Sequence, residues 1–186
     1  MPGSVYAFAA VIGVVALLRL GELLVSARRR RQAPHAPVAE PVVFPLMVAL
    51  HAGLLVGPLA EVVLLERPFL PALAAGAGAV LLLATALRVW TLSTLGRAWN
   101  VRVLAPGAVV THGPYRWIRH PNYLVVILEL AAIPLLHTAW ISALSLSALN
   151  ALVLTLRIRT EERTLAQDPA WVAAMAPKAR FLPGLF

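Results

Sequence analysis

The chain has 186 residues, of which 60% are hydrophobic and only 13% are charged, and its mean hydropathy is +0.81. Soluble globular domains carry about 25% charged residues, so the composition argues against a water-soluble monomer and equally against a disordered chain. The sequence contains no cysteine, which excludes a disulfide scaffold, thiolate metal ligands and a cysteine nucleophile. A small integral membrane protein of one domain, residues 1–186, remains.

Basic residues outnumber acidic residues by 16 to 8, which gives a net charge of +8. They lie between apolar runs, at 28–31, 97–119 and 157–180, rather than in one patch interleaved with aromatic residues. This distribution is typical of a membrane protein whose cytoplasmic loops carry the excess of Lys and Arg. We therefore expect a membrane, and no nucleic acid, as a partner of the chain.

Three apolar runs, each as long as a membrane span, open the chain. A transmembrane helix needs about 20 mainly apolar residues. The runs that satisfy this requirement are residues 5–25, 42–65 and 70–92. A Pro-rich connection at 33–41 follows the first run, and a short turn at 66–68 separates the second from the third. Residues 1–92 are therefore predicted to form three N-terminal spans.

The second half of the chain is predicted to form a loop, a helical hairpin and a surface tail. Glycine and proline recur through 93–122, so this stretch cannot be one continuous helix. The apolar run 123–136 is too short to cross a ~30 Å hydrocarbon core upright, and we expect it to form a hairpin with a last span at 140–156. Residues 93–166 then hold the loop and the hairpin, and residues 167–186 form an interfacial tail.

The expected fold is an all-α integral membrane protein with about five transmembrane helices, the last two forming the hairpin. The three most basic segments fall on one side when the loops are counted alternately, and the N-terminus falls on the other. The positive-inside rule makes the basic side cytoplasmic. The N-terminus is therefore expected outside and the C-terminus in the cytoplasm.

Ionisable side chains within the apolar runs are functional hypotheses by default. Arg19 and Glu22 stand one helical turn apart and suit an i,i+3 ion pair. Glu61 and Arg88 lie near the ends of their runs, where they can reach water by snorkelling. Glu129 lies in the middle of an apolar run with no basic residue one turn away. It either forms an ion pair with Arg19 or Arg88, or it acts as a general base.

The densest group of polar residues is 112–123, His-Gly-Pro-Tyr-Arg-Trp-Ile-Arg-His-Pro-Asn-Tyr. Gly113 allows the backbone to approach a ligand closely, and Pro121 opens the next helix in the favoured first turn. A helix N-terminus preceded by basic residues suits a carboxylate or a phosphate. The alternative is an amphipathic interfacial linker anchored by its aromatic residues.

A second polar group is Arg-Ile-Arg-Thr-Glu-Glu-Arg at 157–163, at the cytoplasmic end of the last span. On a helix, Asn150, Leu154, Arg157 and Glu161 would lie on one stripe. This stripe would carry the amide of Asn150, the guanidinium of Arg157 and the carboxylate of Glu161. Glu162 would point about 100° away from that stripe. Arg157 can hold an anion there and the two carboxylates can hold an ammonium group, or the segment is a solvated helix end with internal Arg–Glu pairs.

The segments Gly-Pro-Tyr-Arg-Trp-Ile-Arg-His-Pro-Asn-Tyr at 113–123 and Arg-Ile-Arg-Thr-Glu-Glu at 157–162 closely resemble the isoprenylcysteine carboxyl methyltransferase family. Its members are integral membrane enzymes that use S-adenosylmethionine. The resemblance is strong over residues 92–165 and extends to the earlier spans by hydropathy alone. Further segments resemble a bacterial branch that O-methylates alkylpyrones and alkylresorcinols, namely Arg-Leu-Gly-Glu-Leu at 19–23, Leu50-His51, residues 87–99 and residues 120–129.

The resemblance implies an all-helical bundle with a cytoplasmic cofactor pocket that the tail closes, in a bacterial inner membrane. It implies no metal. Within the loop and hairpin of 93–166, it implies that S-adenosylmethionine is held by Val109, Val110, Gly113, Tyr115, Arg119, His120, Tyr123 and Glu161. It further implies that Arg157 and Glu162 orient the substrate and take part in catalysis, with Asn150 on the same substrate-facing stripe.

Methyl transfer from a sulfonium to an oxygen is an in-line displacement, which a dry pocket and close alignment accelerate. A carboxylate acceptor would be oriented by Arg157 and needs no base, whereas a phenol or enol would be helped by Glu129 or Glu162 as base. We expect an S-adenosylmethionine-dependent O-methyltransferase whose lipophilic substrate, a polyketide-derived phenolic lipid or alkylpyrone, enters from the bilayer. The alternatives are carboxyl methylation of an isoprenylcysteine-like substrate and a non-enzymatic small membrane carrier.

Overall fold

The computed structural model of the chain describes residues 2–32, 43–96, 99 and 109–184, and these residues form helices and connecting turns with no β-strand. The α-helices are α1 (Gly3–Gln32), α2 (Val43–Leu64), α3 (Pro71–Leu95), α4 (Pro121–Leu135), α5 (Trp140–Leu165) and α6 (Pro169–Met175), and a 3-10 helix, η2, covers Gly113–Arg116. The expected all-α integral membrane architecture is therefore confirmed.

Four of these helices, α1, α2, α3 and α5, are long and apolar enough to cross a membrane. The fifth helix of the sequence-based expectation is α4, which has 15 residues. At 1.5 Å per residue it is ~22 Å long, shorter than the ~30 Å hydrocarbon core. A total of five membrane crossings therefore stays a prediction.

Three helices extend beyond the apolar runs that predicted them. Helix α1 continues to residue 32 rather than 25, α3 to residue 95 rather than 92, and α5 to residue 165 rather than 156. An apolar run ends where the hydrocarbon ends, but a helix continues until a breaker residue stops it. Helix α3 ends at Gly96, whose φ of +51° favours glycine, and Pro169 follows closely on α5.

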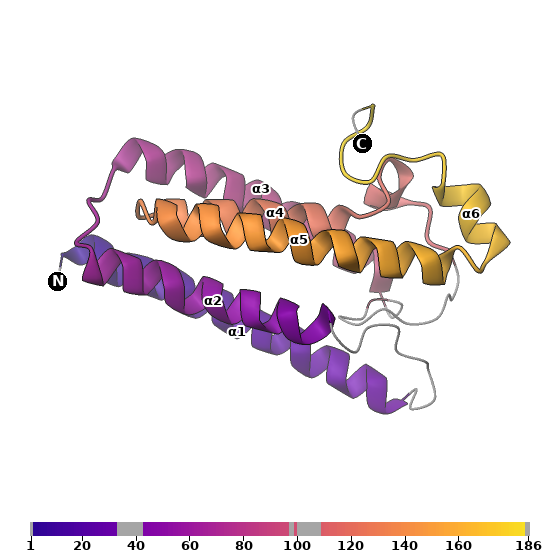
Figure 1. Ribbon diagram of the computed structural model, residues 1–186, viewed down its shortest axis with the longest axis horizontal. Helices are drawn as coiled ribbons and strands as arrows, with labels where there is room; N and C mark the ends of the chain where they lie inside the picture. The colour runs from indigo at the N-terminus through magenta and orange to yellow at the C-terminus, as the bar shows by residue number, and fades with distance from the viewer. Residues whose placement is uncertain (1, 33–42, 97–98, 100–108, 185–186) are drawn as a thin grey trace.

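Helices that follow one another in the chain run antiparallel along the length of the molecule (Figure 1). The N-terminus, the α2–α3 turn and the α4–α5 turn lie at one end. The opposite end, called the site end below, holds η2, the start of α4, the last turns of α5, and α6 (Figure 1). The topology thus brings both polar segments found in the sequence to the same end of the bundle.

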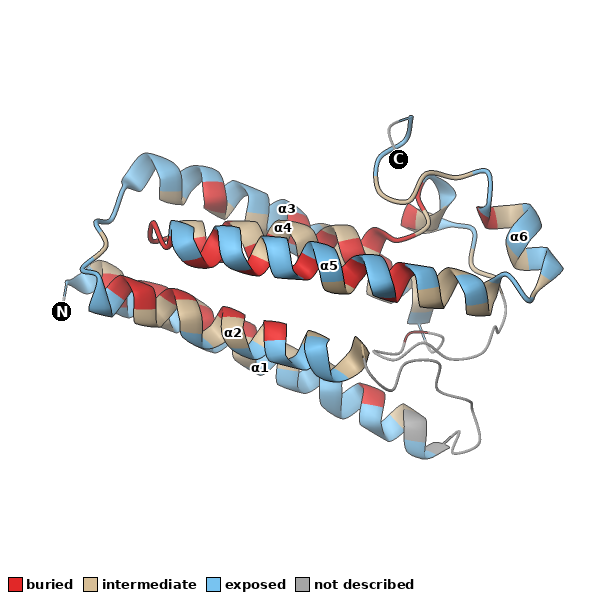
Figure 2. Ribbon diagram, in the orientation of Figure 1, coloured by how far each residue is buried: buried red, intermediate tan, exposed pale blue. Residues whose placement is uncertain are grey.

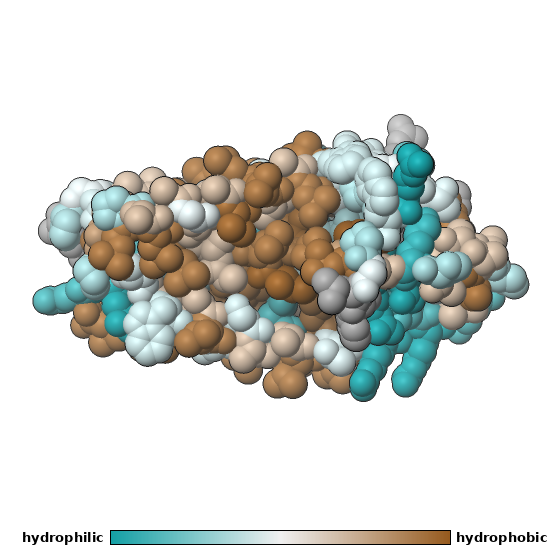
Figure 3. Space-filling view, turned by 90° about the horizontal axis from the view of Figure 1, so that it is seen from above, coloured by the Kyte–Doolittle hydropathy of each residue, from teal (hydrophilic) through white to brown (hydrophobic). Residues whose placement is uncertain are grey.

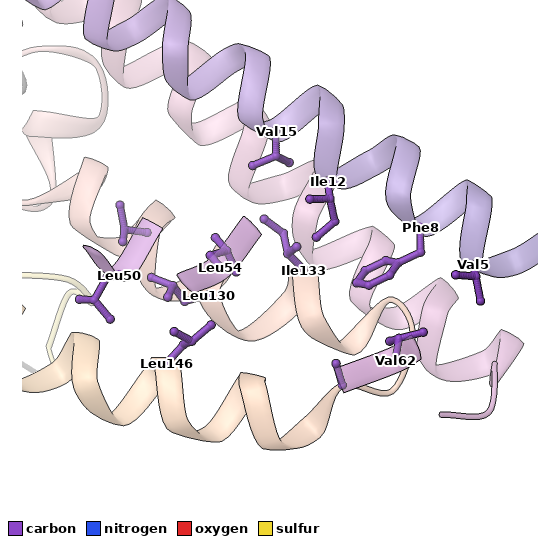
Figure 4. Packing of buried hydrophobic residues seen from close by; sticks show 12 residues of the cluster. Val5, Phe8, Ile12, Val15, Leu50, Leu54, Val62, Leu130, Ile133 and Leu146 are labelled. Carbon is purple, nitrogen blue, oxygen red and sulfur yellow. The ribbon is translucent and has the colours of Figure 1, made fainter. Parts of the chain in front are cut away.

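Buried residues lie on the inner faces of the helices, and residues on the outer faces are exposed (Figure 2). The central core is formed by Phe8 and Ile12 of α1, Leu54 of α2, and Leu130 and Ile133 of α4 (Figure 4). Hydrophobic surface covers the middle of the molecule in the view of Figure 3, and hydrophilic side chains gather toward the site end. This pattern is the one that a lipid environment favours.

Glu61 does not snorkel to water as the sequence suggested, since its side chain is buried. Its carboxylate accepts hydrogen bonds from the backbone N–H groups of Ile141 and Ser142 at 3.1 and 2.7 Å, and Arg67 Nε donates to it at 3.0 Å. Glu61 therefore satisfies the free N–H groups at the start of α5, where a negative charge is favoured by the helix dipole. Two of the groups that replace water belong to α5 and the third is Arg67 of the α2–α3 turn, so hydropathy along α2 cannot reveal them.

Candidate active site

The start of the polar segment 112–123 packs against α3. Gly113 has a φ of +59°, and a Cβ at this position would collide with the side chain of Thr94. Pro114 then fixes the start of η2, and Pro121 is the first residue of α4. Glycine and the two prolines thus set the path by which the chain enters α4, as the sequence indicated.

Tyr123 connects the two polar segments. Its hydroxyl accepts a hydrogen bond from Arg157 Nε at 2.6 Å and donates one to the carboxylate of Glu161. Tyr123 and Arg157 are 7% and 4% exposed. The predicted stripe on the last helix is present, because Asn150, Leu154 and Arg157 are all buried on α5. A guanidinium and a carboxylate therefore lie on either side of one phenol.

Glu162 lies on another face of α5 and is bound by three side chains. Arg119 Nη1 and His120 Nε2 each lie 3.0 Å from its Oε1, and Arg180 donates from Nε at 3.1 Å and from Nη2 at 2.8 Å. Sequence reasoning identified Arg119 and His120 but missed Arg180. Its only signal in the sequence is a positive charge within the tail, which does not reveal a partner.

The C-terminal tail lies across the polar segment. The backbone N–H of Arg119 donates to the carbonyl of Ala179 at 2.9 Å, and that of His120 donates to the carbonyl of Arg180 at 3.1 Å. The Phe181 ring lies 6.5 Å from the His120 ring. The tail therefore covers the start of α4. The predicted position of the tail along the membrane surface stays a prediction.

Two tyrosines interact with the Glu161 carboxylate, and a histidine stacks on one of them. The His120 and Tyr123 rings are stacked, with centroids 5.2 Å apart and planes inclined by 17°. Burial raises the pKa of Tyr115, and the charge of Glu161 raises that pKa further. The Tyr115 hydroxyl therefore keeps its proton at neutral pH.

Comparison with known proteins identifies the family. The model of the isoprenylcysteine carboxyl methyltransferase (ICMT) family matches residues 77–167, which include both polar segments. The uncharacterized protein YpbQ of Bacillus subtilis (strain 168) is 38% identical over 126 residues, which are 67% of this chain and 74% of that protein. The chain belongs to the ICMT family. It is accordingly a membrane methyltransferase, from a family whose members use S-adenosylmethionine as methyl donor.

The two polar segments at the site end offer groups that fit S-adenosylmethionine. Glu161 presents a carboxylate for an ammonium group, and Tyr123 and His120 present flat apolar faces. Two buried polar atoms in the described part of the site lack a hydrogen-bond partner, Arg119 Nε and Asn122 Oδ1. An unpaired buried polar atom costs free energy, so this donor and this acceptor suit a ligand that supplies their partners. Sequence reasoning did not single out Asn122.

Some expected cofactor contacts stay predictions. Val109 and Val110 are half-buried and lead into the polar segment, and their role toward the cofactor is untested. Residues 33–41, together with Arg97 and Arg102 of the predicted basic loop, lie outside the described residues.

A cavity of about 310 Å³ lies at the site end, between α4, α5 and the tail. Its apolar wall comes from Ile127, Leu154, Ile158 and Phe181, and its polar groups include Ser147, Asn150, Thr155 and Arg180. Ala151 and Thr155 also line the cavity and are exposed on the outer face of α5. The cavity thus joins the lipid-facing surface to the predicted substrate-facing residue Asn150.

Glu129 is part of an ion-pair network between α1, α3 and α4. Both of its carboxylate oxygens accept from Arg19 Nη2, at 2.6 and 2.7 Å, and Arg88 Nη1 lies 3.6 Å from it. Glu22 accepts from Arg19 at 2.7 Å, which confirms the i,i+3 pair, and from Arg88 Nε at 2.6 Å. Arg88 therefore turns inward instead of snorkelling.

The ion pairs of Glu129 are the alternative that the sequence left open for this residue. Two guanidinium groups and two carboxylates make the network neutral, which offsets the cost of placing charges at membrane depth. Because Arg19 engages both oxygens of Glu129, the geometry disfavours the catalytic-base role, which stays a prediction. The partners are 110 positions apart in the sequence, so no local pattern reveals them.

Proposed function

We propose that this ICMT-family protein transfers a methyl group from S-adenosylmethionine to a hydroxyl of a lipophilic acceptor, a polyketide-derived phenolic lipid or alkylpyrone. The observation that carries the proposal is the Arg157–Tyr123–Glu161 chain of hydrogen bonds. It places a group suited to the cofactor and a group suited to the acceptor on opposite sides of one buried phenol. The second observation is the lipid-facing cavity, which has hydroxyl and amide groups within an apolar wall.

S-adenosylmethionine, when bound, supplies an electrophilic methyl group. The residues of the chain must hold donor and acceptor in line, an effect worth up to ~7–11 kcal/mol. Glu161, with Arg119, His120 and Tyr123, is proposed to bind the cofactor, and Arg157 to orient the acceptor. Glu162 is bound by Arg119, His120 and Arg180, so we propose that it positions the tail and the cofactor segment over the reacting groups.

The acceptor is proposed to enter sideways from the bilayer through the cavity between α4 and α5. Ile127, Leu154 and Ile158 would contact its alkyl chain, because they line the apolar part of the cavity. Asn150 is buried at the cavity wall and can pair with a ring oxygen. The cofactor pocket is proposed to face the cytoplasm of a bacterial inner membrane, with the N-terminus outside.

Carboxyl methylation of an isoprenylcysteine-like substrate is the second candidate. One observation favours it, the buried guanidinium of Arg157, which can pair with a carboxylate. A carboxylate is already ionised at neutral pH, so this reaction needs no base. The two candidates therefore differ in whether a proton must leave the acceptor.

Purified protein tests the proposal against the alternative of a non-enzymatic carrier. S-adenosylhomocysteine at 100 times its dissociation constant should stabilise the protein by ~2.7 kcal/mol in thermal unfolding. The protein should then methylate an alkylresorcinol and leave a prenylcysteine analogue unmodified. Absence of stabilisation would favour the carrier, and methylation of the prenylcysteine alone would favour carboxyl methylation.

A further inference from the structure

A hydroxyl acceptor must lose its proton, and neither carboxylate expected to serve as base is free to take it. Glu162 is bound by Arg119, Arg180 and His120. Glu129 is bound through both oxygens by Arg19. A carboxylate that forms ion pairs with guanidinium groups is a poor proton acceptor, because protonation would break those pairs. If the proposed reaction is correct, another group in the bundle must act as base.

His51 of α2 has a ring nitrogen that can take up a proton. Its Nδ1 lies 2.8 Å from the backbone carbonyl oxygen of Met47, one helical turn earlier. A carbonyl oxygen only accepts hydrogen bonds, so Nδ1 carries the proton in this contact. In the neutral ring, Nε2 then has the lone pair and is the basic atom. His51 is half-buried, and it lies next to Leu50 and one turn from Leu54, which are both buried on α2.

His51 lies one helical turn from Met47, a residue that contacts the proposed acceptor-orienting group. The sulfur of Met47 contacts Arg157 Nη1, so α2 meets α5 one turn away from His51. The charges that act on the ring are those of Arg19 from α1, Glu129 from α4 and Arg157 from α5. His51 therefore lies between the Arg157 end of the site and the ion-pair network deeper in the bundle.

We infer that Nε2 of His51 is the base that accepts the proton of the acceptor hydroxyl, an inference that rests on the proposed function. As the S–CH3 bond breaks and the O–CH3 bond forms, sulfur keeps the electron pair of the broken bond. The O–H proton moves to Nε2 and gives an imidazolium. The imidazolium returns this proton to water after the product leaves, so the ring is restored for the next turnover.

Two substitutions of His51 separate the base from the helix contact. His51→Asn keeps a donor for the Met47 carbonyl but removes Nε2, and His51→Gln places a non-basic amide near the position of Nε2. With an alkylresorcinol at neutral pH, both should lower kcat/KM by about 10²–10⁴-fold. Val48→Ala is the matched control on the same turn, and it should stay within about threefold of wild type because Val48 is exposed and the base is intact.

A second acceptor tests the chemical role. A dinitro-substituted alkylresorcinol, whose hydroxyl is already ionised at neutral pH, needs no base, so His51→Asn should change its kcat/KM by less than about threefold. The pH profile for the plain alkylresorcinol should lose its histidine limb in the variant. Calorimetry should show unchanged affinity for S-adenosylhomocysteine, because His51 is placed at the acceptor and not at the cofactor.

The outcomes distinguish the inference from the proposed function. If wild type methylates the alkylresorcinol and His51→Asn does so equally well, or if both acceptors lose the same factor, His51 is not the base while the proposed function stands. If wild type methylates neither ring, the proposed function is wrong and the inference falls with it.

Discussion

Tyr123 accepts a hydrogen bond from Arg157 and donates one to Glu161, so the roles proposed for the two charged residues are separable at the residue scale. Glu161→Gln removes the charge proposed to bind the cofactor's ammonium group. The affinity for S-adenosylhomocysteine should fall by about 1.5–3 kcal/mol, roughly 10- to 150-fold. Arg157→Lys should leave that affinity within about threefold and lower acceptor turnover. Calorimetry measures both, and equal losses of affinity would contradict the division of roles.

Gly113 is a second position where a single atom matters. Gly113→Ala places a Cβ against Thr94 at a positive φ. The free energy of unfolding of the variant should therefore be ~1–3 kcal/mol lower than that of wild type. Thr94→Ala removes the colliding atoms beyond Cβ. In the double variant the effect of Gly113→Ala should therefore shrink by ~0.5 kcal/mol or more. Thermal unfolding in detergent measures this cycle, and strictly additive effects would show that the two residues do not meet.

At the scale of elements, the ion-pair network fixes α1 against α3 and α4. Glu129→Gln leaves Arg19 and Arg88 with Glu22 as their anion, so it should destabilise the protein by ~3–5 kcal/mol. Adding Arg19→Gln restores neutrality and should recover part of that loss. Thermal unfolding of both variants, with turnover measured alongside, checks this expectation. Wild-type stability of Glu129→Gln combined with lost turnover would instead support Glu129 as a base.

The sequence predicts the long helices and the spacing of the site residues, but it does not predict which side chains meet between helices. Hydropathy located every long helix, because burial in lipid depends on local composition, and motif spacing located the stripe of Asn150, Arg157 and Glu161. Neither hydropathy nor motif spacing showed where the side chains of Glu61 and Arg88 point, since partners of both belong to other helices. Arg180 was missed for the same reason. A partner many turns away in sequence is set by packing and not by periodicity.

At the scale of the whole molecule, the basic segments at the site end predict that the site lies on the cytoplasmic side of the membrane. Thr111 is exposed and leads into the polar segment, and the chain has no cysteine of its own. A cysteine introduced at Thr111 should react with a membrane-impermeant reagent from the cytoplasmic side. Bound S-adenosylhomocysteine should protect it. Labelling from the opposite side alone would contradict the proposed orientation.

The central claim is that the site end transfers a methyl group to a lipid hydroxyl. The most direct measurement gives the reconstituted protein S-adenosylmethionine with an isotopically labelled methyl group and an alkylresorcinol, and analyses the lipid by mass spectrometry. Wild type should produce a lipid that has gained one labelled methyl group on oxygen, and Glu161→Gln should produce much less of it. An unchanged lipid, or equal product from both proteins, would contradict the central claim.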